Sequence, residues 1–130
     1  MSEEAPSEGK VVDPDTAPRR DMQLERGYAI QLVDPNLGAE RLDMHINVLK
    51  ARGAPGPYHL HTNCENIYFI LEGDVVVTID GVAHQMKPGM AVFIPPNVPH
   101  SASNVGDTEA RLVEIYTPPG QDFVHVAKEG

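Results

Sequence analysis

The sequence predicts an all-β fold, and three features of its 130 residues lead to that prediction. Twelve prolines and eleven glycines interrupt the chain so often that long helices are not expected. The segments between these breaks are short and rich in valine, isoleucine, tyrosine and phenylalanine, which favour strands. Turn signals follow most of the segments. About eight short strands separated by turns predict a sandwich or a small barrel.

Seven segments have strand composition, at residues 28–33, 42–49, 67–71, 75–79, 82–86, 90–94 and 110–116. Residues 42–49 alternate clearly, with His45 and Asn47 on the polar face and aliphatic residues on the other. Asp80-Gly81 is the strongest hairpin signal in the chain, because this pair suits a type I′ turn. The short stretch that carries His59 and His61 is an eighth candidate strand.

Composition limits the domain organisation and the partners. One domain with one core is expected at residues 21–130, after a flexible, acidic, proline-containing tail at residues 1–20. The net charge of −9 argues against nucleic acid and against anionic membrane, and no apolar segment is long enough to span a bilayer. Cys64 is the only cysteine, which excludes an intrachain disulfide. Since residues 1–10 also lack a signal-peptide pattern, we expect a cytoplasmic protein.

Two histidine motifs mark the candidate site. On a strand, His59 and His61 point to the same face because side chains alternate, and two imidazoles on one face favour a metal site. A proline-stiffened loop, PPNVPH, delivers His100. Three imidazoles from separate segments can converge inside a barrel. They suit one divalent transition metal, with Fe, Mn, Ni, Cu, Zn and Co all allowed.

These motifs resemble those of the cupin family, G-x5-H-x-H-x(3 or 4)-E-x6-G and G-x5-P-x-G-x2-H-x3-N. Residues 53–73 match the first motif, and residues 89–104, ending with Asn104, match the second. The resemblance implies a double-stranded β-helix, or jelly-roll barrel, with His59, His61 and His100 as metal ligands. Asn97 stands where the second motif has a glycine, and asparagine tolerates a left-handed backbone better than other residues.

The departure at the first motif concerns its metal-binding glutamate. Counting back from Gly73, that position is Asn66, and Glu65 lies one residue earlier. Strand alternation places Asn66 on the face of the site and Glu65 on the other face, unless a bulge reverses the two. We expect Asn66 to be a neutral fourth ligand.

Other polar residues are candidates for chemistry. Tyr68 shares the face of Asn66 and is either a general acid or base or a barrel tyrosine with a polar neighbour. Glu114 interrupts an apolar strand. Inside the barrel it is a candidate catalytic base, although the usual exposure of glutamate favours the surface. For His45 and Asn47 the surface position is also favoured over the cavity.

Two function classes follow. We expect an enzyme that uses its metal on a small organic molecule. The resemblance implies several possible reaction types: enzymes of this family include dioxygenases, isomerases, lyases, decarboxylases and cyclases. Among these activities we favour a dioxygenase slightly. The alternative is a non-catalytic cupin that binds a sugar or another small molecule, which the missing glutamate favours. A homodimer is expected because two-fold dimers are the commonest assembly.

Overall fold

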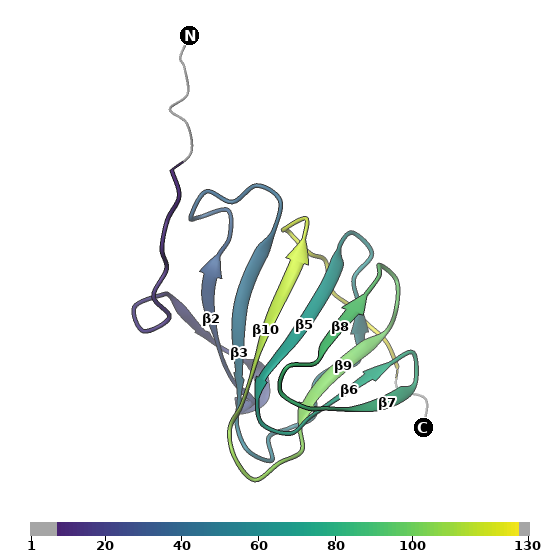
Figure 1. Ribbon diagram of the computed structural model, residues 1–130. Coiled ribbons are helices and arrows are strands. Elements are labelled where there is room, and N and C mark those ends of the chain that lie inside the picture. The colour runs from purple at the N-terminus through teal and green to yellow at the C-terminus, as the bar shows by residue number, and fades with distance from the viewer. Residues whose placement is uncertain (1–7, 128–130) are drawn as a thin grey trace.

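The computed structural model describes residues 8–127 and confirms a jelly-roll of two antiparallel sheets (Figure 1). One sheet has the strand order β1-β2-β3-β10-β5-β8 and the other β11-β4-β9-β6-β7. The strands are β1 (Arg19–Asp21), β2 (Gly27–Val33), β3 (Asp43–Leu49), β4 (His59–Leu60), β5 (Glu65–Glu72), β6 (Val75–Ile79), β7 (Val82–Met86), β8 (Ala91–Ile94), β9 (His100–Asn104), β10 (Ala110–Thr117) and β11 (Val124–His125). A single 3-10 turn, η1 (Gln23–Glu25), accompanies them in the described part of the chain.

The seven strands expected from composition are all present, within a few residues of their predicted bounds. The Asp80-Gly81 hairpin between β6 and β7 is also confirmed, and both residues have the positive φ that a type I′ turn requires. Three strands were not predicted: β1, β9 and β11. β9 was missed because its sequence, HSASN, is polar and lacks the aliphatic pattern of a strand.

Two apolar clusters hold the fold together. The main one lies between the sheets and includes the side chains of Ile70, Val77 and Leu112. The second lies on the outer face of the larger sheet, where Ile30, Ile46 and Val48 pack together with Ala17 of the N-terminal segment. β3 is therefore buried on both faces. Its aliphatic side chains Ile46 and Val48 pack in the outer cluster, and its polar side chains face the space between the sheets.

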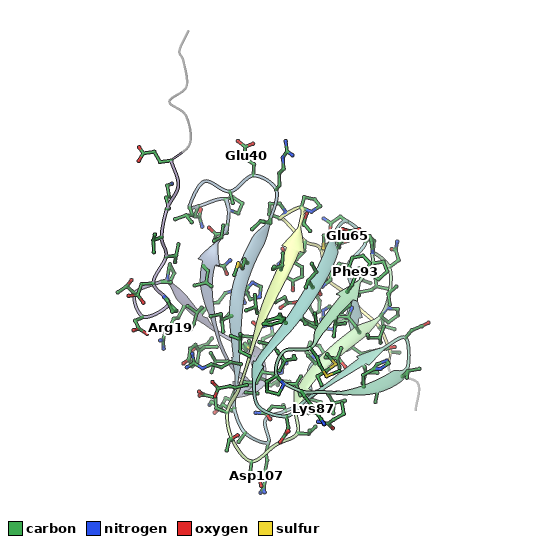
Figure 2. All side chains as sticks on the ribbon, in the orientation of Figure 1. Arg19, Glu40, Glu65, Lys87, Phe93 and Asp107 are labelled. Atoms are coloured by element: carbon green, nitrogen blue, oxygen red, sulfur yellow. The ribbon has the colours of Figure 1, made fainter. Side chains whose placement is uncertain are left out.

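The apolar side chains of the strands are divided between the core and the surface. Ile70, Val77 and Ile94 are buried, but Phe69 and Phe93 are 41% and 57% exposed. These two aromatic residues lie on the outer face of β5 and β8, because the inward positions of β5 belong to Asn66, Tyr68 and Ile70. Figure 2 labels Phe93 on β8.

The N-terminal segment is partly built into the fold. β1 pairs with β2, so the predicted boundary at residue 20 falls inside a strand, while residues 1–7 of the predicted tail lie outside the described range. None of the helical segments among residues 8–127 is long and apolar enough to cross a membrane.

Candidate metal centre

Three histidines converge at one end of the cavity between the sheets. His59 is on β4, His61 follows β4, and His100 opens β9, where it pairs with His59 across the strands. All three side chains are buried, and one ligand atom from each lies within 4.8 Å of the others. The rings of His59 and His100 have centroids 4.4 Å apart. The two sequence motifs thus meet at a single point.

Backbone hydrogen bonds fix which nitrogen of each ring is free. Nδ1 of His59 donates to the carbonyl of Pro57 at 2.8 Å, and Nδ1 of His100 donates to Val98 at 2.9 Å. Nδ1 of His61 donates to the carbonyl of Asp122. Each ring then presents an unprotonated Nε2 to the common point, which is the arrangement that metal-binding histidines use.

The environment keeps two of these imidazoles neutral. Burial lowers the pKa of His59 to about 4, although the Pro57 hydrogen bond raises it, and the neighbouring His100 and His61 lower it as well. Burial likewise lowers the pKa of His100. A neutral imidazole has a lone pair for a metal ion at physiological pH. The Nε2 atoms of His61 and His100 are buried without a hydrogen-bond partner, which is costly unless an ion occupies the point they share. The three histidines therefore fit a metal ion.

Asn66 lies on the buried face of β5, and Glu65 is exposed. No bulge interrupts this part of β5, which pairs in register with β10 from Glu65 to Ile70. The amide nitrogen of Asn66 donates to Glu114 Oε2 at 3.1 Å and to the carbonyl of Ile115 at 3.0 Å. Its Oδ1 is buried and has no partner. The side chain of Asn66 is therefore on the inner face, as alternation predicts, and its amide oxygen is unpaired.

Glu114 is buried inside the barrel, which corrects the surface position that its residue type favours. Its carboxylate accepts hydrogen bonds from His45 Nε2 at 3.0 Å and from Asn47 Nδ2 at 2.8 Å, in addition to Asn66. Burial alone would raise the pKa of Glu114, but these donors and the charge of His45 lower it to about 2. The carboxylate is therefore ionised at neutral pH.

His45 and Asn47 also lie inside, so the surface position expected for them is wrong. The reason is that the aliphatic face of β3 packs under the N-terminal segment, which leaves the polar face for the cavity. Nδ1 of His45 is 3.0 Å from Asp43 Oδ1. Burial would lower the pKa of His45, but hydrogen bonds to Asp43 and Glu114 outweigh it and raise the pKa to about 9. His45 and Glu114 form a buried imidazolium–carboxylate pair.

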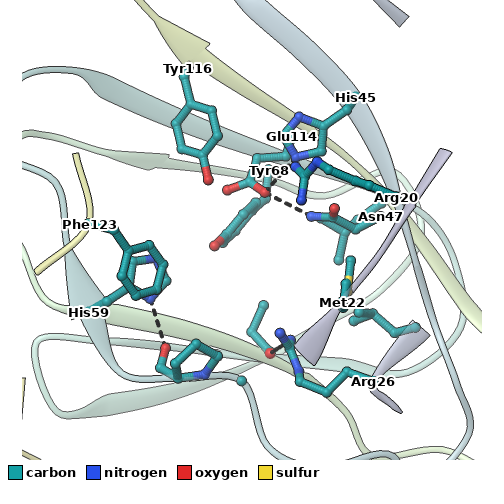
Figure 3. A pocket seen from close by; sticks show the side chains of 15 residues that line it. Arg20, Met22, Arg26, His45, Asn47, His59, Tyr68, Glu114, Tyr116 and Phe123 are labelled. Atoms are coloured by element: carbon teal, nitrogen blue, oxygen red, sulfur yellow. Dashed lines mark hydrogen bonds and ion pairs between the residues drawn. The ribbon is translucent and has the colours of Figure 1, made fainter. Parts of the chain in front are cut away.

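The cavity beside the histidines has a volume of about 150 Å³ (Figure 3). Tyr68 and Tyr116 line it, and burial, together with the charge of Glu114, raises the pKa of both phenols well above the ordinary value of 10.0. Both hydroxyls are therefore protonated and can donate. The remaining lining residues are Arg20, Met22, Arg26, His45, Asn47, Leu49, Gly56, Pro57, His59, Ala102, Leu112, Glu114 and Phe123.

The C-terminal segment contributes to the site although it carried no sequence signal. The ring of Phe123 stacks on His59, with centroids 4.0 Å apart and planes 11° from parallel. The Asp122 carboxylate accepts from the backbone and hydroxyl of Thr62, and its carbonyl holds His61. This segment braces two of the three histidines.

The remaining titratable candidates stay outside the cluster. His84 and His125 are exposed. Cys64 is buried, and burial raises the pKa of its thiol to about 11, so it is a neutral thiol.

Two second-motif residues have structural roles. Asn97 has a φ of 71° and donates its backbone N–H to the His61 carbonyl, and Asn104 Nδ2 donates to the carbonyls of Leu49, Lys50 and Thr108.

Comparison with known proteins agrees with this architecture. Residues 48–116 match the family described as Cupin domain. An uncharacterised protein of Methanocaldococcus jannaschii is 29% identical over 68% of this chain and 71% of its own length. A glucose-6-phosphate isomerase of Thermococcus litoralis is 31% identical over 58% of this chain and 43% of its own length. Two further curated relatives are matched over about half of their length.

Solved structures agree on the fold. The polyketide cyclase RemF from Streptomyces resistomycificus superposes with a TM-score of 0.80. The alignment covers 94% of this chain and 88% of RemF at 22% sequence identity.

Proposed function

The chain belongs to the cupin family, and from that premise we propose that it is a metal-dependent enzyme acting on a small organic molecule. The observation that carries the proposal is the convergence of His59, His61 and His100 beside a cavity, where the buried Nε2 atoms of His61 and His100 have no protein partner. A purely structural histidine cluster would be expected to satisfy these nitrogens with protein groups.

The three histidines, with the Asn66 amide oxygen as a fourth group, would hold one divalent transition metal. All four groups are neutral, so the bound site keeps the full charge of the ion. When bound, such a metal acts as a Lewis acid that polarises an oxygen atom of the substrate. The ligand set does not select among iron, manganese, nickel, copper, zinc and cobalt.

Glu114 is assigned a positioning role and not that of the general base. A carboxylate with a pKa of about 2 is a weak base at neutral pH, because the best catalytic base has a pKa near the working pH. Glu114 instead accepts a hydrogen bond from Nδ2 of Asn66. This bond turns the amide oxygen of Asn66 away from Glu114, and that oxygen is left unpaired. His45 neutralises the buried carboxylate.

Tyr68 and Tyr116 are the candidate hydrogen-bond donors to the reacting oxygen. Both line the cavity, and both phenols are held in the neutral form by burial and by the nearby carboxylate. A neutral phenol can donate a hydrogen bond to an oxygen on which negative charge develops. This favours chemistry through an enolate-like state, as in an isomerisation or a cyclisation. The relative named as an isomerase supports the same class.

The proposal is tested by turnover in heavy water. Metal-loaded protein is incubated in D₂O with a panel of small hydroxy and oxo acids and sugars, and deuterium incorporation is followed by NMR. Wild-type protein should exchange or convert at least one compound, Tyr68→Phe should be slower, and His100→Ala inactive. An oxygen electrode run on the same panel tests the dioxygenase prediction. Binding without exchange, conversion or oxygen uptake would support the non-catalytic alternative.

A further inference from the structure

Arg26 presents a buried donor that the metal centre does not explain. Four buried side-chain polar atoms have no hydrogen-bond partner within residues 8–127, and three of them belong to His61, Asn66 and His100. The fourth is Nε of Arg26, a residue that lines the cavity together with His59. An unpaired donor on a charged group is more costly than one on a neutral group, so a partner is expected when the protein works.

The local structure holds the guanidinium in place. Arg26 follows η1, where Leu24 and Glu25 both have positive φ, and its carbonyl accepts from the backbone N–H of Lys50 at 2.8 Å. Its Nη2 donates to the carbonyl of Ala102 on β9 at 3.2 Å. A group held this way loses little conformational freedom when it binds a ligand.

Gly56 gives the guanidinium the space it needs. A Cβ at this position would lie 3.0 Å from Arg26 Nη2 and 2.3 Å from the Ala102 carbonyl oxygen. Any larger side chain would therefore displace the contact between Arg26 and β9. Figure 3 shows Arg26 across the cavity from Glu114 and Tyr68, so the guanidinium faces the space where a substrate would lie.

The charges around the cavity favour an anionic ligand. The Glu114 carboxylate is already paired with His45. Arg26 forms no ion pair with any residue of the described range, and Arg20 adds a second guanidinium at the exposed edge of the cavity. Burial lowers the pKa of Arg26, and the proximity of Tyr68 and Glu114 partly offsets this, but a guanidinium stays charged in proteins. The cavity therefore carries unneutralised positive charge even without a metal.

We propose that Arg26 binds a carboxylate of the substrate, so that the enzyme acts on a small organic acid. The planar guanidinium carries its N–H donors in pairs whose geometry matches the two oxygens of a carboxylate. The cavity of about 150 Å³ equals one that accommodates benzene, which limits the enclosed part of the ligand to about six heavy atoms. This inference rests on the proposed function only in calling the ligand a substrate, because the anion site itself needs no metal.

The test uses matched acids and amides. Pyruvate and benzoate, their neutral amides, and inorganic phosphate are titrated calorimetrically into zinc-loaded wild type, Arg26→Met, Arg26→Lys and Arg52→Met. Arg52 is the control because it is exposed and pairs with Asp107 away from the cavity. We expect the acids to bind wild type and Arg52→Met, the amides to bind more weakly, and Arg26→Met to lose about 10- to 100-fold in acid affinity. Arg26→Lys should recover part of the lost acid affinity, because lysine keeps the positive charge but lacks the paired N–H donors of a guanidinium.

Three results would overturn the inference: no acid binds wild type, the amides bind as tightly as the acids, or Arg26→Met binds the acids like wild type. Binding of phosphate alone, dependent on Arg26, would contradict the choice of carboxylate. If Arg26→Met does not fold, the acid–amide contrast in wild type and the Arg26→Lys titration still decide. The same titrations on EDTA-treated protein separate the two proposals. Arg26-dependent acid binding in a protein that takes up no metal would refute the metalloenzyme and keep the anion site.

Discussion

Replacing Glu114 by glutamine tests whether the buried imidazolium–carboxylate pair is present and what it contributes. Glutamine has the same shape but no charge, and it offers one acceptor oxygen where the carboxylate accepts from His45, Asn47 and Asn66. At least one of these donors then faces the new amide N–H₂. His45 keeps a single carboxylate partner, Asp43.

The expected size follows from that geometry. Disrupting a buried, hydrogen-bonded ion pair by removing one charge costs about 3 kcal/mol or more, since the remaining charge stays buried. The pKa of His45, which two carboxylates raise to about 9, should fall toward its ordinary 6.5 when Glu114 becomes neutral. Urea unfolding at pH 6 measures the free energy of unfolding, and NMR titration of the His45 ring measures its pKa.

Glu65→Gln is the matched control, because Glu65 is an exposed glutamate on β5, the strand beside β10 (Figure 2). It should change the free energy of unfolding by less than about 0.5 kcal/mol. The reasoning would be refuted if Glu114→Gln were as stable as wild type and the His45 pKa were unchanged.

Three further predictions concern pH and the metal centre. Stability should be greatest near pH 6.5, which thermal unfolding across a range of pH measures. The contribution of His45 is lost as pH rises from 6.5 through about 9. Below 6.5 the unfolded chain takes up protons that the buried His59 and His100 do not, and below 4.5 the contribution of Glu114 is lost as well. Asn66→Ala should weaken metal affinity by about tenfold in competition with a chelating dye, whereas Glu65→Ala should not; the reverse result would mean that Glu65 turns inward. Phe123→Ala should speed metal loss to EDTA because it uncovers His59, and an unchanged rate would argue against a covering role for that ring.

The parts of the site that the sequence predicts are those set by local spacing. His59, His61 and His100 follow from two motifs, and the inward position of Asn66 follows from alternation along a regular strand. Alternation separates two faces of a strand without saying which one is inside. For β3 both faces are buried, so the expected exposure of His45 was wrong.

Other parts depend on contacts between distant segments. Arg26 reaches Ala102, which is 76 residues away, through a turn whose positive φ values no local pattern indicates. Phe123 stacks on His59 only because β11 pairs with β4. Phe69 and Phe93 are apolar but outward, since hydrophobicity alone does not set the face of a strand.

The central claim is that His59, His61 and His100 together hold one metal ion. Elemental analysis after loading and exhaustive dialysis tests it most directly, on wild type, His100→Ala and His84→Ala. His84 is the matched control because it is an exposed histidine on β7 outside the cluster. One ion per chain in wild type and in His84→Ala, and its loss in His100→Ala, is the predicted result. A wild type that retains no ion, or a His100→Ala protein that retains a full one, would contradict the claim.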